Sequence, residues 1–345
     1  MPADNSPHTP ATDTTSGPDL RRQQLERWLG DSVGISGPGV AASSDASFRR
    51  YFRYPYNGKT AVAMDAPPAT EDCRPFVKVA ELLAAAGVTV PQILARDLEQ
   101  GFLLLSDLGS QTYLEYMNGP EFVPEQADAL FTRAIDALIK FQCSSRAGVL
   151  PDYDGALLRR ELELFPQWYL QRHLQLPLSD DVNAILAALF RQLIEQVSGQ
   201  SRVFVHRDYM PRNLMVMRDD VGVLDFQDAV YGPISYDPIC LFKDAFISWP
   251  EQQVENWLRQ YWRQGLDAGL PLPGEFADFL RDCDFMGVQR HLKVIGIFAR
   301  ICHRDGKPRY LEDVPRFFDY LGTVARRRPE LAALQQLLDW LEANR

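Results

Sequence analysis

The sequence lacks long apolar runs, paired cysteines and an excess of positive charge. No stretch of about 18 apolar residues exists and no apolar signal segment follows the start, so we expect no transmembrane helix and no signal peptide. The five cysteines are odd in number and have no CxxC or zinc-ligand spacing, which favours the reducing cytoplasm. A formal net charge of −10 argues against nucleic acid or an anionic membrane as the main partner.

The composition is that of an ordinary globular protein. The chain has 345 residues, of which 46% are hydrophobic and 24% charged, which is enough for two lobes or one large domain. We find no internal repeats and no feature that requires an obligate protein partner. A local cluster of arginines can still bind an anionic small molecule, because the local field differs from the net charge.

The residue pattern predicts a tail and two lobes with an α+β plan. Residues 1–19 are rich in Pro, Ser, Thr and Asp and are predicted to form a disordered tail, followed by lobes at 20–108 and 109–345. After a short helix at 21–29, we expect one further helix at 76–86 and strands at 39–43, 51–56, 60–66, 88–94 and 102–105. The second lobe is predicted to be mainly helical, with helices at 124–141, 185–197, 237–247, 250–268, 274–303 and 313–343.

The most informative segment is 203–228, which reads VFVHRDYMPRNLMVMRDDVGVLDFQD. An apolar run leads into a polar loop with Asp208 and Asn213, and a second apolar run ends in Asp225. In phosphoryl transfer, one carboxylate orients the attacking hydroxyl, while an amide oxygen and a second carboxylate hold Mg²⁺ against the nucleotide phosphates. The spacing HxDxxxxN, followed by Asp twelve residues after the Asn, matches the catalytic loop of kinases. Each piece alone is typical of an ordinary turn, but the combination predicts a kinase with a bilobal fold.

The sequence resembles the aminoglycoside phosphotransferase-like branch of the protein-kinase fold. The resemblance covers about residues 20–340 and rests on VHRDYMPRNLM and GVLDFQDAVYGPISYDPICL. The segments SDASFRRYFR, MDAPP, LLSDLG, ELFPQWYL and GVQRHLKVIGIFARICHRDGKPRYL are similar to bacterial anomeric sugar kinases of cell-wall recycling. Those kinases phosphorylate N-acetylmuramate and N-acetylglucosamine at the C1 hydroxyl. The resemblance therefore implies an ATP- and Mg²⁺-dependent amino-sugar kinase of peptidoglycan recycling.

The same resemblance implies roles for the residues of the loop. Asp208 orients the sugar hydroxyl and accepts its proton late in the reaction, and Asn213 and Asp225 bind Mg²⁺. His206 is a buried residue that packs the loop. For Asp237 two alternatives stay open, which are a direct ligand contact and an anchor for a loop or helix end.

The loop expected to hold the nucleotide phosphates contains no glycine. Residues 44–50 read SDASFRR, whereas kinases use a Gly-rich loop whose backbone approaches the phosphates. Small side chains still let backbone and hydroxyl donors approach, so we expect Ser47, Phe48 and Arg49 to contact the nucleotide. The alternative is an ordinary polar hairpin turn.

The third strand lacks the usual phosphate-binding lysine. It reads VAMD where kinases read VAIK, so Met64 and Asp65 stand in the neighbourhood of that cation. We hypothesise that one of Arg49, Arg50 and Arg53, in the loop or the second strand, replaces the lysine, with Arg53 paired to Glu81. Arg50 and Arg53 point to opposite faces of a strand, so at most one of these two points into the cleft. The alternative is that all three are solvated edge residues.

The segment SDLG at 106–109 is predicted to connect the lobes. Backbone groups near Asp107 and Leu108 are expected to contact the adenine edge. The alternative is a simple linker without a role in binding.

The acceptor substrate is expected to lie near Asp208 in the second lobe. Arg290 and His291 stand in the polar segment 289–310, and an arginine fork matches a carboxylate such as that of N-acetylmuramate. Trp168 is a candidate for stacking on a sugar ring. The alternatives are that the charges form a solvated face or bridges to acidic helices, and that the aromatic ring is part of the core.

Two other functions stay open. One is a kinase for another small acceptor, such as an aminoglycoside, choline or homoserine. The other is a nucleotide-sensing pseudokinase, which the missing lysine suggests and the intact Asp208, Asn213 and Asp225 oppose.

Overall fold

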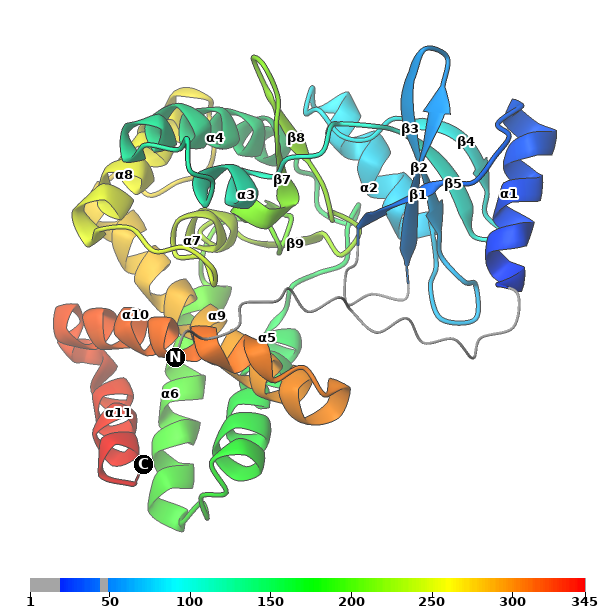
Figure 1. Ribbon diagram of the computed structural model, residues 1–345. Coiled ribbons are helices and arrows are strands. Elements are labelled where there is room, and N and C mark those ends of the chain that lie inside the picture. The colour runs from blue at the N-terminus through cyan, green and yellow to red at the C-terminus, as the bar shows by residue number, and fades with distance from the viewer. Residues whose placement is uncertain (1–18, 44–48, 345) are drawn as a thin grey trace, which may run out of the picture. The chain divides into compact units, whose positions relative to one another are not determined.

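The structure of the chain is a computed structural model that describes residues 19–43 and 49–344 (Figure 1). Residues 1–18 of the tail predicted at 1–19 lie outside these residues, and Asp19 is the residue that precedes the first helix. All five cysteines carry free thiols. Within the described ranges, no helix is long and apolar enough to cross a membrane.

The described residues form two compact units. The first contains 19–43, 49–73 and 92–107, and the second contains 74–91 and 108–344. A small antiparallel sheet dominates the first unit, and helices dominate the second. The predicted α+β class, with a small N-terminal sheet and a larger helical part, is confirmed.

The sheet of the first unit has five antiparallel strands in the order β1-β2-β3-β5-β4. Between β2 and β3, Asn57 and Gly58 have φ angles of 48° and 73°, as a two-residue hairpin turn requires. This turn was predicted from the Asn-Gly pair. The strands are β1 (Val40–Ser43), β2 (Arg50–Tyr56), β3 (Lys59–Asp65), β4 (Ile93–Asp97) and β5 (Phe102–Ser106).

Helix α1 (Leu20–Val33) covers one face of this sheet (Figure 1). Asp19 begins the helix by accepting a hydrogen bond from the backbone N–H of Arg22, and Gly34 ends it with a φ of 72°. Alternate residues of three strands point toward the helix. The resulting core comprises Leu25, Trp28, Leu29 and Ile35 with Phe52, Tyr54, Ala61, Ala63, Phe102 and Leu104.

The strand predicted at 88–94 is wrong in its first half. Strand β4 begins only at Ile93, and Thr89 instead forms a bridge to Gly222 in the second unit. Pro91 separates the two segments, since proline lacks the N–H that a continuous strand would use. Helix α2 (Arg74–Ala85) also belongs to the second unit.

The second unit contains two small sheets among its helices. Strand β6 (Arg202–Val205) pairs with β9 (Val230–Pro233), and β7 (Leu214–Val216) pairs with β8 (Val221–Val223). The longer helices are α4 (Ala127–Cys143), α6 (Asp180–Ser198), α8 (Glu251–Asp267), α9 (Phe276–Asp305), α10 (Val314–Arg327) and α11 (Ala332–Asn344). The shorter helical segments are α3 (Tyr113–Met117), η1 (Pro124–Gln126), α5 (Gly155–Leu162), η2 (Phe165–His173), η3 (Pro211–Asn213), α7 (Tyr236–Phe242), η4 (Pro308–Asp313) and η5 (Pro329–Leu331).

Helix α9 is the central packing element of the second unit. It contacts α5, α6, α7, α10 and the π-helical segment η2. At Gly296, a side chain would not fit, because a Cβ built there would lie 2.4 Å from the carbonyl carbon of Leu164. Glycine therefore permits the backbones of α9 and of the residues entering η2 to approach closely.

Two predicted helices end earlier than expected. The helix expected at 237–247 ends at Phe242. The helix expected at 313–343 breaks into α10 and α11 at Arg328, which has φ −122° and ψ 80°. Arg328 precedes Pro329, and a residue before proline avoids the helical conformation.

Candidate active site

The HxDxxxxN motif lies on the loop that connects β6 to β7. Two short sheets hold the ends of this loop, because β6 pairs with β9 and β7 with β8. The backbone N–H of Leu224 donates to the carbonyl of Asn213 at 2.9 Å, and the side-chain amide of Asn213 donates to the carbonyl of Asp208 at 2.9 Å. These bonds bring Asp208, Asn213 and Asp225 into one region of the second unit.

Asp237, on α7, anchors the same loop. Its fully buried carboxylate accepts hydrogen bonds from the backbone N–H groups of His206 at 2.7 Å and Arg207 at 3.0 Å. Arg207 has a φ of 76°, which is strained for a residue with a Cβ and needs such support. Burial raises the pKa of Asp237 to about 7, and its two backbone donors act in the opposite direction. Of the two sequence alternatives for Asp237, the structure supports the anchor.

His206 is buried inside the loop, as predicted. Its Nε2 lies 3.0 Å from the carbonyl oxygen of Leu224, and its Nδ1 lies 3.3 Å from the backbone nitrogen of Asp208. A neutral ring satisfies both contacts when Nε2–H donates to Leu224 and Nδ1 accepts from Asp208. Burial lowers the pKa of His206 to about 4, which keeps the ring neutral near pH 7.

Opposing influences act on the carboxylate of Asp208. Burial is the largest and raises its pKa above the ordinary value, and the negative charge of Asp225 acts in the same direction. Three cations, Lys293, Arg207 and Arg290, lower it. The net effect is a pKa of Asp208 above the ordinary value.

Asn213 and Asp225 offer oxygen ligands of the kind that Mg²⁺ prefers. The bond from Asn213 to Asp208 uses the amide nitrogen of Asn213 and not its oxygen. Asp225 has a φ of 60°, a strained conformation of the kind that recurs at functional sites. In the part of the chain that the structure describes, no group of three His, Cys, Asp or Glu side chains is arranged for a metal ion. An ion held here would therefore take its other ligands from a nucleotide or from water. The two oxygen ligands of Asn213 and Asp225 fit such a site.

Asp65, at the end of β3, stands near the place of the missing lysine and binds arginines. Its carboxylate is fully buried and lies 2.7 Å from Arg21 and 2.6 Å from Arg50. Arg50 also binds Asp19 at 2.5 Å. Because Arg50 and Phe52 share a strand face, Arg50 lies on the side of the sheet that α1 covers.

Arg49 and Arg53, the other two candidate arginines, also lie close to carboxylates. Arg49 lies 3.7 Å from Glu71. Arg53 binds Asp107 through two contacts, at 2.6 Å and 3.1 Å, and this pair raises the pKa of the Arg53 guanidinium. Glu81 belongs to the second unit, so its pairing with Arg53 stays a prediction.

The remaining predicted nucleotide contacts are only partly described. Ser47 and Phe48 lie outside the described residues. The chain passes from the first unit to the second between Asp107 and Leu108. Leu108 packs against β8, since a Cβ built at Gly222 would lie 2.8 Å from its Cδ1. The expected adenine contacts stay a prediction.

The three predicted substrate residues lie in the second unit. Arg290, on α9, is 2% exposed, donates to Cys240 Sγ at 3.0 Å and reaches the carbonyl of Lys243 at 3.5 Å. His291 is fully buried, and burial lowers its pKa well below the ordinary value. Trp168 is half-buried on η2. Of the three, Arg290 is the one whose charge acts on Asp208.

Sequence reasoning missed Glu161, a buried carboxylate on α5. It lies 2.6 Å from Arg207 and 3.2 Å from Lys293. No sequence signal marks it, because Glu161 stands in an ordinary amphipathic helix and is 46 residues before Arg207 in the chain. Only the fold brings the two together.

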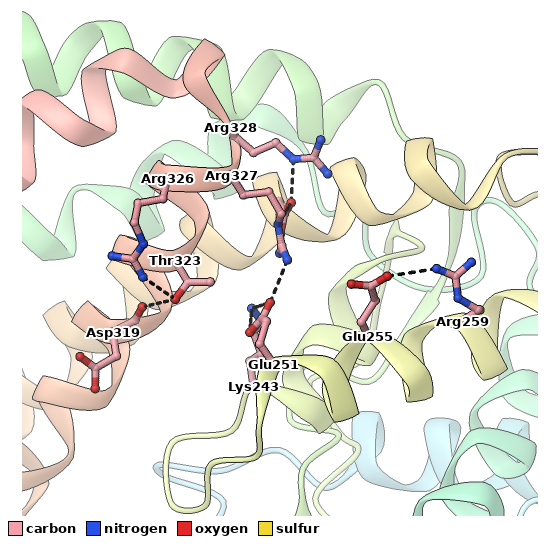
Figure 2. A network of polar contacts seen from close by, with 10 residues as sticks. Lys243, Glu251, Glu255, Arg259, Asp319, Thr323, Arg326, Arg327 and Arg328 are labelled. Atoms are coloured by element: carbon pink, nitrogen blue, oxygen red, sulfur yellow. Dashed lines mark hydrogen bonds and ion pairs between the residues drawn. The ribbon is translucent and has the colours of Figure 1, made fainter.

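A polar network joins four helices of the second unit (Figure 2). Lys243, just after α7, binds Glu251 at the start of α8 at 2.9 Å. Arg327, at the end of α10, binds the same Glu251 at 2.9 Å and also Asp284 of α9. Arg328 adds a contact to Asp284 at 2.7 Å. These basic residues therefore link α7, α8, α9 and α10 through the two carboxylates of Glu251 and Asp284.

Comparison with curated proteins finds relatives over nearly the whole chain. A protein named N-acetylmuramate/N-acetylglucosamine kinase from Pseudomonas aeruginosa is 60% identical, covering 93% of this chain and 96% of that protein. A protein of the same name from Pseudomonas putida is 56% identical, covering 94% and 98%. A third, from Neisseria meningitidis, is 45% identical, covering 86% and 88%.

Solved structures share the fold at much lower identity. The choline kinase LicA from Streptococcus pneumoniae superposes with a TM-score of 0.62 at 13% identity, covering 88% of this chain and 98% of that one. The ADP-bound aminoglycoside phosphotransferase APH(2'')-Ib gives 0.58 at 14% identity, covering 86% and 97%. At these identities the likeness shows a common protein-kinase-like fold.

A family model described as "Phosphotransferase enzyme family" matches residues 39–278. The match spans more than half of the chain and includes the loop from His206 to Asn213 together with Asp225. The fold shared with phosphotransferases and the arrangement of this loop agree with the match. The chain belongs to the phosphotransferase enzyme family.

Proposed function

We propose that this protein transfers the γ-phosphate of ATP to the C1 hydroxyl of N-acetylmuramate and N-acetylglucosamine, in the cytoplasm and as part of peptidoglycan recycling. The observation that carries the proposal is the 60% identity, over 93% of this chain, with a kinase named for these two sugars. The grouping of Asp208, Asn213 and Asp225 supports the same reaction class.

In the proposed reaction, Asp208 orients the C1 hydroxyl and takes its proton as the new oxygen–phosphorus bond forms. The bond from the γ-phosphorus to the bridging oxygen breaks, and ADP leaves with that oxygen. The raised pKa of Asp208 suits this role, because a more basic carboxylate accepts the proton more readily.

Asn213 and Asp225 are proposed to hold Mg²⁺. The bound ion would neutralise phosphate charge and orient the nucleotide. For the nucleotide itself we propose contacts from the segment 44–50, from Arg53 and from the backbone at 107–108. Each described arginine among these is bound to a carboxylate, so a phosphate would have to share or displace that partner.

Arg290 is our proposed partner for the lactyl carboxylate of N-acetylmuramate. Its guanidinium has five N–H donors, yet the described bonds go to one thiol and one distant carbonyl. The Asp244 and Asp208 carboxylates attract this guanidinium, and a substrate carboxylate would add charge-assisted hydrogen bonds to it. We propose that His291 and Trp168 lie along the same substrate region, with Trp168 stacking on the sugar ring.

A panel of acceptors tests the function directly. The protein is incubated with ATP, Mg²⁺ and either N-acetylmuramate, N-acetylglucosamine, kanamycin, choline or homoserine, and ADP release is measured. Turnover confined to the amino sugars supports the proposal, and turnover confined to another acceptor contradicts it. Nucleotide binding without any turnover would favour a nucleotide sensor.

A further inference from the structure

A buried carboxylate outside the catalytic motif collects several polar side chains. Glu161, in the last turn of α5, is 6% exposed. Its Oε1 accepts a hydrogen bond from Arg207 Nη2 at 2.6 Å and lies 3.2 Å from Lys293 Nζ. Its Oε2 accepts from the Tyr153 hydroxyl and from the Gln289 amide at 3.2 Å. Glu161 thus joins α9, the segment before α5 and the loop after β6.

Glu161 binds Arg207, which is the residue immediately before Asp208 in the chain. The backbone of Arg207 is left-handed, with a φ of 76°. Its N–H donates to Asp237 at 3.0 Å, and its carbonyl accepts from the Cys240 thiol at 3.5 Å. The backbone of Arg207 is therefore fixed from α7, and its side chain is fixed by Glu161. Any movement of this residue changes the direction in which the next side chain points.

We propose that Glu161 is a positioning residue for phosphoryl transfer. It binds the Arg207 side chain and so keeps the loop in the strained conformation that directs the Asp208 carboxylate toward the acceptor hydroxyl. The inference rests on the proposed function, because it assumes that Asp208 orients that hydroxyl. Glu161 acts through Arg207 and not on the reacting atoms.

The energetics of a buried pair make this role sensitive to substitution. The Glu161 and Arg207 side chains are 7% and 22% exposed, and a charge-assisted bond of 2.6 Å is short. Without Glu161, the guanidinium of Arg207 loses the carboxylate that it binds, and a largely buried charge without that partner is driven toward water. For Arg207, that movement would pull on the strained backbone next to Asp208.

A double-mutant cycle in steady-state kinetics tests the proposal. ADP release with ATP, Mg²⁺ and N-acetylglucosamine is measured for Glu161→Gln, Arg207→Gln and the double variant. We expect each single change to lower kcat at least tenfold, with the KM values for ATP and sugar within threefold of the unaltered protein. We expect the double variant to lie within threefold of the slower single variant, because both changes remove the same contact.

Two further variants separate positioning from general stability. Glu163→Gln alters a half-exposed acid on the neighbouring turn, which lies 3.7 Å from Arg159, and should leave kcat unchanged. Glu161→Asp retains the charge and should recover part of the kcat that Glu161→Gln loses. If Glu161→Gln does not fold, Glu161→Asp should still fold and can be measured in its place. Hydrogen exchange at the amides of Arg207 and Asp208 should accelerate in Glu161→Gln and not in Glu163→Gln.

Three results would overturn the inference. One is an unchanged kcat in a folded Glu161→Gln variant. Another is a double variant whose loss equals the product of the single losses. The third is a larger non-additivity of Glu161→Gln with Lys293→Met than with Arg207→Gln, which would mean that Glu161 acts mainly through Lys293. By contrast, unaltered protein that turns over no amino sugar would refute the proposed function, and the hydrogen-exchange comparison would still decide whether Glu161 fixes the loop.

Discussion

Replacing Gly296 with alanine should force α9 away from the residues entering η2. A Cβ at this position would lie 2.4 Å from the carbonyl carbon of Leu164, 2.6 Å from its oxygen and 2.7 Å from the nitrogen of Phe165. Ordinary contacts begin at 3.4 Å, so the two backbones must separate by roughly 1 Å. The obstacle is backbone, so no change of rotamer relieves it.

The expected magnitude follows from two opposing effects. Alanine is favoured over glycine inside a helix by about 1 kcal/mol. Overpacking a dense core costs about 1–3 kcal/mol, and a backbone obstacle belongs at the upper end of that range. We therefore expect Gly296→Ala to lower the free energy of unfolding by about 2 kcal/mol.

Gly322, in α10, offers a matched control for this substitution. The nearest atom to a Cβ there is the end of the flexible Arg326 side chain, at 3.4 Å. Gly322→Ala should therefore be neutral or stabilising by up to about 1 kcal/mol. Urea unfolding measures both variants, and kcat should also fall in Gly296→Ala because η2 follows α5, which carries Glu161. Equal stability of the two variants would refute this account of the packing between α9 and η2.

Four further outcomes are expected. Asp208→Asn should lose turnover while the Kd for ATP, measured by calorimetry, stays within threefold; an active variant would exclude the assigned proton transfer. In ¹⁵N-detected NMR, His206 should stay neutral and carry its proton on Nε2 from pH 8 to pH 5.5, since burial lowers its pKa to about 4; an imidazolium signal at pH 6 would contradict this. The folded-state pKa of Asp237, about 7, lies above the ordinary value. Between about pH 4 and pH 7, the folded state therefore retains a proton that the unfolded state has lost. The contribution of Asp237 to stability thus falls as the pH rises. The unfolding free energy of the unaltered protein minus that of Asp237→Asn should therefore fall by up to about 4 kcal/mol across this window, and a pH-independent difference would count against it. Arg290→Met should lower kcat/KM for N-acetylmuramate about tenfold or more and leave N-acetylglucosamine, which has no carboxylate, within threefold; equal losses would remove Arg290 from carboxylate recognition.

The loop residues could be predicted because their chemistry is local in the sequence. His206, Asp208 and Asn213 stand at fixed spacing between two apolar runs, and strand pairing on both sides then determines the loop ends. The Asn57-Gly58 turn was predictable for the same reason, since both residues tolerate positive φ.

Long-range contacts could not be predicted from spacing. For Asp65, the sequence showed only that kinases have a lysine near this position. The binding of Asp65 to Arg21 and Arg50 depends on how α1 packs on the sheet. Glu161 reaches Arg207 only because the helical unit packs α5 beside the loop. The helix break before Pro329, by contrast, had a local signal in the sequence, namely the proline itself. One helix was nevertheless predicted at 313–343, because apolar residues recur at helical spacing on both sides of the proline.

The most direct measurement is ³¹P NMR of the product formed from ATP and N-acetylglucosamine. The proposed function predicts a phosphate monoester whose phosphorus couples to the anomeric proton of the sugar, formed by the unaltered protein and not by Asp208→Asn. A phosphate on any other hydroxyl, or no sugar phosphate at all, would contradict it.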